Sequence, residues 1–259
     1  MSKRPIGIFD SGIGGTSIFK EIRALLPNEH MIYLADSANA PYGDKPKEKI
    51  AELSIKNTDL LIKKGAKLIV VACNTATTNA IKLLRENYNL PIIGIEPAIK
   101  PAALNTKTKT VGILATRGTL SSELFHKTTD LYSSNIRVIE QEGEGIVPLI
   151  EAGKINTPEM EALLGVYLKP MLAANIDYLV LGCTHYPYLI PALLKMLPEH
   201  VKIIDSGQAV AKQTKAILEK EGLLNVNLKK GNCRFYSNGN IKVLEFILDD
   251  KYKVEYLNF

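Results

Sequence analysis

The chain has 259 residues, a formal net charge of +5, 46% hydrophobic residues and 23% charged residues. This is the composition of a globular protein with one large core or two smaller ones. No apolar stretch approaches the roughly 20 residues of a membrane span, and the amino terminus lacks the apolar region of a signal peptide. We therefore expect a cytoplasmic protein with no membrane partner. The lysines are scattered rather than gathered with aromatic residues, which argues against nucleic-acid binding.

Short apolar runs alternate with amphipathic stretches through the first part of the chain. Pro27 ends the first amphipathic stretch and Gly65 ends the second, as expected at the ends of helices. The pattern predicts strands at 6–9, 31–35, 68–72 and 91–95, helices at 16–26, 47–64 and 77–87, and a loop at 40–43.

The same alternation restarts after residues 96–98. It predicts strands at 110–114, 136–139, 178–181, 202–204, 234–237 and 252–256, and helices at 120–131, 158–173, 188–197 and 207–221. Such alternation is typical of parallel sheets with helices on both faces. The predicted fold class is α/β, with two similar domains of mainly parallel sheets flanked by helices. We predict that residues 1–97 plus 207–259 form the first domain and residues 98–206 the second.

Two pairs of segments resemble each other. Residues 68–75 and 178–185 each pass from an apolar run through a small residue to a cysteine and polar side chains. Residues 6–11 and 111–116 each end an apolar run at a hydroxyl residue. The shared order predicts two halves related by a pseudo-twofold axis, with the active site between them. The alternative is that any two α/β domains carry apolar strands at comparable intervals.

The three cysteines are Cys73, Cys183 and Cys233. An odd, sparse set does not make a disulfide framework, and no cysteine or histidine spacing matches a zinc site. We therefore expect reduced thiols and no metal. Cys233 has no polar context and is expected to be structural.

Cys73 and Cys183 each follow a predicted strand, at the sheet edge where open α/β folds bind ligands. Two facing thiols suit a reaction that removes a proton from one face of a carbon and returns it to the other. A helix amino terminus after Cys73 predicts a lowered thiol pKa. His185 is placed to polarise Cys183 or to carry a proton. The competing interpretation of each cysteine alone is inert packing.

The glycine-rich segment 10–15 follows a strand and opens a helix. Backbone amides at such a turn favour an anion. The segment lacks the full dinucleotide pattern, so a carboxylate or another polar group is the favoured ligand. The competing interpretation is a tight turn without a ligand.

Five segments match, in order, the pattern of a known family; they are 9–15, 40–43, 72–77, 94–98 and 181–187. The chain thereby resembles glutamate racemase, in the cofactor-independent, two-cysteine aspartate/glutamate racemase family. The resemblance implies interconversion of L- and D-glutamate without a cofactor, to supply D-glutamate for peptidoglycan. It implies that Cys183 takes the proton from L-glutamate and Cys73 takes it from D-glutamate. It allows a homodimer.

The resemblance also implies which residues serve the reaction. Asp10, Glu151 and His185 would assist the thiols. The segment 141–145 departs from the family pattern close to Glu151, which puts that role in doubt. The substrate site would be lined by Asp10, Ser11, Tyr42, Gly43, Asn74, Thr75, Thr184 and His185.

Three other functions remain open on the sequence. An aspartate or other acidic amino-acid racemase would share the two-cysteine plan. A non-catalytic binding protein for acidic amino acids would not exchange the α-proton. A single-thiol hydrolase would form an acyl-thioester and leave the second cysteine unexplained.

Overall fold

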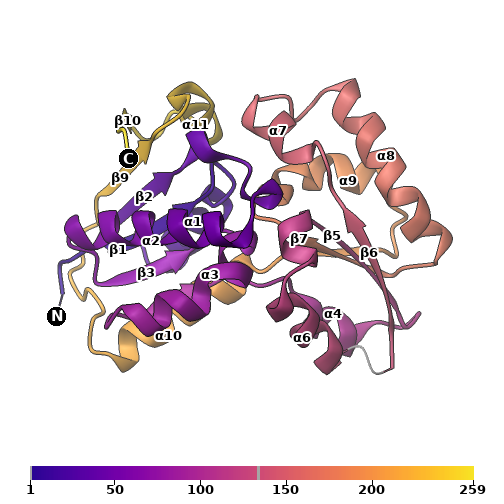
Figure 1. Cartoon of the computed structure of the whole chain (residues 1–259), viewed down its shortest axis with the longest axis horizontal. Helices are drawn as coiled ribbons and strands as arrows, with labels where there is room; N and C mark the ends of the chain where they lie inside the picture. Colours follow the sequence, from indigo (N-terminus) through magenta and orange to yellow (C-terminus); the bar gives the residue numbers. More distant parts are fainter. Residues whose placement is uncertain (1, 133–134) are drawn as a thin grey trace.

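Two parallel β-sheets organise the chain, one in each of two domains (Figure 1). The structure is a computed structural model, and it describes residues 2–132 and 135–259. The first sheet has the strand order β10-β9-β2-β1-β3-β4, and the second has the order β6-β5-β7-β8. The strands are β1 (Ile6–Asp10), β2 (Met31–Ala35), β3 (Leu68–Val71), β4 (Ile92–Gly94), β5 (Thr110–Ala115), β6 (Arg137–Glu142), β7 (Tyr178–Gly182), β8 (Lys202–Ile204), β9 (Cys233–Ser237) and β10 (Val254–Tyr256).

Helices flank both sheets and confirm the predicted α/β class. Short 3₁₀ turns at Ser37–Asn39, Tyr42–Asp44 and Tyr186–Leu189 connect some of them. The helices are α1 (Thr16–Leu25), α2 (Lys47–Lys63), α3 (Asn74–Asn87), α4 (Ile99–Asn105), α5 (Arg117–Leu120), α6 (Glu123–Tyr132), α7 (Ile146–Glu151), α8 (Pro158–Ala173), α9 (Ile190–Met196), α10 (Gly207–Lys220) and α11 (Ile241–Ile247). Within the described residues, no helix combines the length and the apolar character that a bilayer crossing requires.

The first sheet is buried on both faces, which explains its nearly continuous apolar strands. Ile6 and Ile8 of β1 belong to one core cluster with Ile22 of α1. Phe9 points to the opposite face, into a second cluster with Leu53 of α2. Side chains that alternate along the strand therefore fix helices on both faces.

The two halves share one strand arrangement. Each contains a four-strand order, β2-β1-β3-β4 in the first and β6-β5-β7-β8 in the second. Ile6 pairs with Leu68, and Val111 pairs with Tyr178. Because the cysteine of each half follows its strand at the same offset from these pairs, the two thiols occupy equivalent positions. The predicted relation between the halves is confirmed.

The chain returns to the first domain at its end. β9 pairs with β2, β10 pairs with β9, and α10 packs beside α1 (Figure 1). The strands of the first sheet thus come from residues 6–94 and 233–256, and those of the second from residues 110–204. The finer domain bounds, 1–97 plus 207–259 and 98–206, remain a prediction.

Several helices differ from the predicted pattern. The helix expected at 120–131 is two helices, α5 and α6, because the Ser122 hydroxyl accepts a hydrogen bond from the Phe125 N–H and starts a new helix. α3 begins before residue 77, because the Thr77 hydroxyl donates to the Val71 carbonyl and fixes the first turn despite its β-branched residues. The short helices α4, α7 and α11 were not predicted.

Candidate active site

The carboxyl ends of β1, β3, β5 and β7 meet at the boundary between the domains. Both cysteine thiols line a small cavity there, of about 10 Å³. Almost all the predicted substrate residues line it too; the full lining is Ser11, Pro41, Tyr42, Gly43, Cys73, Asn74, Thr75, Thr116, Val147, Cys183, Thr184 and His185. A cavity of about 800 Å³ lies elsewhere along α3, but no cysteine or histidine lines it. The small cavity is therefore the candidate active site.

Cys73 sits at the amino terminus of α3. Its sulfur accepts a hydrogen bond from the Ala76 N–H at 3.4 Å and lies 3.7 Å from the Ser11 hydroxyl oxygen. Burial raises the pKa of Cys73 well above its usual range, and the nearby charge of Asp10 raises it further. The hydrogen bonds with Ala76 and Ser11 oppose this shift but do not overcome it. The predicted lowering of the Cys73 pKa is therefore wrong: desolvation outweighs the helix terminus.

Asp10 is fully buried and is not among the residues that line the cavity. Its Oδ2 accepts hydrogen bonds from the N–H groups of Gly12 and Gly15, at 3.1 and 3.0 Å. Its Oδ1 accepts a 3.2 Å hydrogen bond from the Thr184 hydroxyl, which belongs to the other half of the site. Burial raises the pKa of Asp10, and the charge of His185 partly offsets the rise. Asp10 thus fixes the glycine turn and joins it to the strand end that carries Cys183.

His185 connects Cys183 to a carboxylate. Its Nδ1 lies 3.7 Å from the Cys183 sulfur, and its Nε2 lies 2.6 Å from Glu151 Oε1. Burial alone would lower the pKa of His185, but the hydrogen bonds with Cys183 and Glu151 raise it well above the usual value. These two contacts therefore favour the charged form of the imidazole. Glu151, whose role was in doubt, lies in direct contact with this imidazole.

The glycine turn presses against that histidine and carboxylate. Glu151 Oε1 accepts a 2.7 Å hydrogen bond from the Ile13 N–H. A Cβ atom at Gly12 would overlap the Glu151 carboxylate, and one at Gly14 would overlap the His185 ring. Glycine is required here because the turn and the second domain approach so closely. The close packing of the turn against Glu151 and His185 explains its glycines, and no bound phosphate is needed to explain them.

Tyr42 and Gly43 contribute a wall of the cavity. The Tyr42 side chain is buried, and its hydroxyl donates to Asp36 Oδ2 at 2.5 Å and accepts from Asn57 Nδ2 at 3.0 Å. The hydroxyl is thus occupied away from the thiols. A substrate would meet the ring and the backbone of this turn rather than the phenol.

Asn74 and Thr75 extend from the first turn of α3. Both polar atoms of the buried Asn74 amide lack a hydrogen-bond partner among the described residues. A buried amide without a partner is costly, and in a cavity it points to a ligand. The Thr75 hydroxyl lies 2.8 Å from that of Thr116, across the domain boundary.

Three lining residues, Pro41, Thr116 and Val147, were not among the predicted site residues, although Pro41 lies in the predicted loop at 40–43. A signal for Thr116 existed, because it follows β5 as Ser11 follows β1 in the duplicated pattern. Val147 lies on α7, which the sequence pattern did not reveal. Cys233 lies at the start of β9 and does not line the cavity. In the ranges 2–132 and 135–259, no cluster of three metal-ligating side chains occurs.

Comparisons with known proteins place this geometry in a family. The model of the Asp/Glu/Hydantoin racemase family matches residues 6–214. The chain belongs to this family. It is 47% identical over 248 residues to the glutamate racemase of Ectopseudomonas mendocina, covering 95% of this chain and 94% of that protein.

Solved racemase structures share the fold over nearly the whole chain. A glutamate racemase isoform of Bacillus anthracis superposes with a TM-score of 0.89 at 30% identity, covering 99% of this chain and 98% of that one. The glutamate racemase of Francisella tularensis, solved with D-glutamate, gives a TM-score of 0.86 at 32% identity, with 99% and 98% covered.

Proposed function

We propose that the chain is a glutamate racemase, an isomerase that interconverts L- and D-glutamate by two-base proton transfer between Cα and the thiols of Cys73 and Cys183. The observation that carries the proposal is the equivalent placement of these thiols, each at the end of a matching strand and both facing one cavity. A hydrolase needs one such nucleophile. A binding protein needs neither.

The surroundings of the thiols suggest which proton moves first. The Cys183 sulfur lies 3.7 Å from Nδ1 of His185, whose raised pKa favours a positive charge beside it. The raised pKa keeps Cys73 protonated. This pairing suits L-glutamate: Cys183 removes the α-proton, and Cys73 donates its proton to the opposite face of Cα. The products are D-glutamate, a Cys183 thiol and a Cys73 thiolate, which is the state that processes D-glutamate.

Neutral polar groups would bind the substrate. None of the residues that line the cavity is lysine or arginine. The carboxylates of glutamate would instead meet the Asn74 amide, the hydroxyls of Ser11, Thr75 and Thr184, and the N–H groups at the start of α3. Preorganised dipoles of this kind also stabilise negative charge that develops at Cα. We expect no cofactor to contribute.

The domains must separate to admit glutamate. A cavity of about 10 Å³ is near the lower limit for a single water molecule. The contacts that must open join the two domains directly: Thr75 with Thr116, Asp10 with Thr184, and the Ile13 N–H with Glu151. We infer that closure brings both thiols against Cα and excludes water.

The cellular role follows from the substrate. We propose that the enzyme works in the cytoplasm and supplies D-glutamate for peptidoglycan. The homodimer remains a prediction, which light scattering on the purified protein will test.

A single experiment separates the candidate functions. Purified protein, dialysed against a chelator and given no cofactor, is incubated separately with L-glutamate and with L-aspartate in deuterated water. For glutamate, we expect the optical rotation to be lost and deuterium to be incorporated at Cα. Faster reaction of aspartate would make the chain an aspartate racemase. Binding of glutamate without deuterium incorporation would refute the enzymatic function.

A further inference from the structure

Two loops from distant parts of the sequence meet at the carboxyl edge of the first sheet. They follow β2 and β9, which run parallel and end in register (Figure 1). Asp36 and Asn238, the first residues after these strands, are therefore neighbours although 202 positions separate them along the chain. The contact is close, because a Cβ atom at Gly239 would lie 2.6 Å from the Cβ atom of Ser37. The segment that returns to the first domain thus packs against the loop after β2.

Asn238 uses both polar atoms of its amide in this contact. Its Nδ2 donates to Asp36 Oδ1 at 2.5 Å and to the main-chain oxygen of Phe259 at 3.1 Å. Its Oδ1 accepts a 2.9 Å hydrogen bond from the Ala38 N–H. Because Asn238 and Asp36 are both buried, water would replace these bonds poorly if they were lost. Asn238 therefore joins the residues after β10 to the loop after β2.

Asp36 connects Asn238 to the wall of the active site. Its Oδ2 accepts the hydrogen bond from the Tyr42 hydroxyl at 2.5 Å, and its Oδ1 accepts a second one from Asn39 Nδ2 at 2.8 Å. Asn57 Nδ2 lies 3.5 Å from Oδ2 and donates to the Tyr42 hydroxyl at 3.0 Å. An ionised carboxylate only accepts hydrogen bonds, so its position depends on these donors. Loss of the Asn238 donor would let the carboxylate, and the loop it binds, shift.

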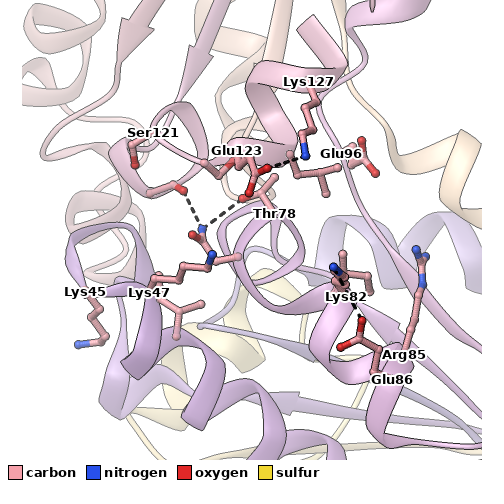
Figure 2. Close-up of a pocket in the computed structure, with 16 residues that line it drawn as sticks. Lys45, Lys47, Thr78, Lys82, Arg85, Glu86, Glu96, Ser121, Glu123 and Lys127 are labelled. Atoms are coloured by element: carbon pink, nitrogen blue, oxygen red, sulfur yellow. Dashed lines mark hydrogen bonds and ion pairs between the residues drawn. The ribbon is translucent and has the colours of Figure 1, made fainter.

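The loop that Asp36 binds reaches the thiol cavity at Tyr42 and Gly43, which line it. A Cβ atom at Gly43 would lie 2.9 Å from the Thr116 side chain, so the loop also abuts the second domain. None of the residues 36–44 lines the larger cavity along α3 that Figure 2 shows. A shift of this loop would therefore change the wall of the thiol cavity and leave the lining of the larger one in place.

The same loop also contacts the charged side of the active site. The Ser37 hydroxyl donates to Glu151 Oε2 at 3.4 Å, and the other oxygen of that carboxylate lies 2.6 Å from His185 Nε2. A displaced loop would therefore weaken the support of the imidazole beside Cys183. Misplacement of reacting groups by about 1 Å can slow catalysis about 10²-fold, even when the substitution is remote from the chemistry.

We propose that Asn238 is a positioning residue for racemisation, which acts through Asp36 on the loop that carries Tyr42 and Gly43. The inference rests on the proposed racemase function. Asn238 does not line the thiol cavity, so its effect on the reaction is indirect. The segment after β9 is thereby part of the framework of the active site. The alternative is that Asn238 only stabilises the first domain.

Two variants make the same chemical change at nearby positions. Asn238→Asp keeps the shape of the side chain and an acceptor for the Ala38 N–H, but it removes both donated bonds and places a second carboxylate against Asp36. Asn240→Asp is the control, because Asn240 is exposed and its Oδ1 caps α11 by accepting the Lys242 N–H at 3.0 Å. Aspartate caps a helix as well as asparagine does. Asn238→Ala removes the three bonds without adding charge, and it serves if Asn238→Asp does not fold.

Initial rates are followed by optical rotation well below the melting temperature of each variant, and thermal unfolding gives the folded fraction. We expect Asn238→Ala to lower kcat/KM at least about fivefold, with most of the loss in kcat, because the misplaced wall no longer aligns the thiols with Cα. Asn238→Asp should lose at least as much, and Asn240→Asp should stay within about twofold of the wild type. A residue that only stabilised the domain would lower the melting temperature and leave the kcat/KM of folded molecules unchanged. That result would overturn the proposal.

Tyr42→Phe tests whether Asn238 acts through Asp36. This substitution keeps the ring in the cavity wall and removes the hydrogen bond to Asp36. The double variant Asn238→Ala/Tyr42→Phe should then lose little more kcat/KM than the more damaging single variant, because both changes free the same loop. Losses that multiply in the double variant would overturn the proposed connection. A wild type without racemase activity would refute the proposed function itself, whereas an active wild type with an equally active Asn238→Ala variant would refute only this inference.

Discussion

The two thiols occupy equivalent positions in two related halves, yet their surroundings differ. Burial and, to a smaller extent, the charge of Asp10 raise the pKa of Cys73, which also contacts the Ser11 hydroxyl. Cys183 meets the charged imidazole of His185, which Glu151 supports. Duplication therefore explains where the thiols lie, while neighbouring residues make their electrostatic surroundings different. The backbones of the two halves are thus equivalent at the thiols, while the charged side chains around the thiols differ.

Removing either sulfur tests the shared part of this comparison and should have the largest effect. Cys73→Ser and Cys183→Ser should each lower racemisation about 10²- to 10⁴-fold, because each removes a positioned acid–base group. Cys233→Ser is the matched control and should remain close to wild type. Optical rotation with both enantiomers measures the rates, and thermal unfolding checks the fold. A fast Cys73→Ser or Cys183→Ser variant would remove the two-base assignment.

The partners test the asymmetric part. His185→Asn should slow proton transfer at Cys183, and Asp10→Asn should slow proton transfer at Cys73. Each should lower one directional kcat about tenfold or more, the factor that one pKa unit represents. The ratio of kcat/KM between directions must stay fixed by the equilibrium between enantiomers. Initial rates in both directions across pH measure the effect. If only KM changes and the pH limits do not shift, these side chains bind substrate and do nothing more.

Gly14→Ala tests whether the turn must fit closely against the imidazole. The added Cβ would overlap His185, so we expect a clear loss of kcat with a smaller loss of stability. Gly165→Ala is the control, because its Cβ would meet only Met196 at an ordinary 3.7 Å and alanine favours a helix. Steady-state kinetics and thermal melting of both variants distinguish displacement of the histidine from general destabilisation. Full activity of Gly14→Ala would show that the close approach is not needed.

Glu151→Gln gives a smaller effect with a defined pH dependence. Glutamine can still accept the Ile13 N–H bond, but it no longer helps to raise the pKa of His185. A histidine with a raised folded-state pKa contributes stability that is fully present below its unfolded pKa of about 6.5, and that is lost as pH rises through the folded value. The free energy of unfolding of the wild type should therefore exceed that of the variant by about 1–3 kcal/mol near pH 6. This difference should shrink at higher pH. Denaturant unfolding at several pH values measures the gap, and a gap that widens with pH would contradict this assignment.

Ser11→Ala and Thr116→Val compare the two matched hydroxyls and should have the smallest effects. Ser11→Ala removes one weak contact with a thiol, whereas Thr116→Val removes hydrogen bonds with Thr75 and Thr119, including the N-cap bond of α5. Each should change kcat/KM only about two- to tenfold. Ser11 contacts the Cys73 sulfur, whereas Thr116 contacts Thr75. We expect Ser11→Ala to alter kcat and Thr116→Val to alter KM. The opposite assignment would show that Ser11 holds substrate and Thr116 tunes a thiol.

Much of the arrangement could be predicted from sequence, because apolar runs and helix-end signals are local. The strands at 31–35 and 202–204 and the helix at 158–173 have the predicted bounds. The sequence also predicted that residues far apart along the chain would meet, because parallel strands place their carboxyl ends at one edge of a sheet. The remaining errors concern interactions that only the folded chain supplies.

The Cys73 pKa shows one such interaction. A helix amino terminus is visible in sequence, but the desolvation that outweighs it depends on how the second domain covers the site. The helix α7 shows another, because Pro148 in a short apolar segment gives no helical period. Its residue Val147 lines the cavity from the second domain. Tyr42 lines the cavity, and Asp36 holds its hydroxyl, a pairing that the sequence does not reveal.

The small thiol cavity has a consequence for inhibitor discovery. The cavity is smaller than the substrate, so computational docking of rigid molecules into this closed shape will reject true ligands. A compound can enter only when the domains have separated. Its apparent dissociation constant is therefore the intrinsic constant divided by the fraction of molecules that are open. Molecules that prefer the parted form would avoid that loss.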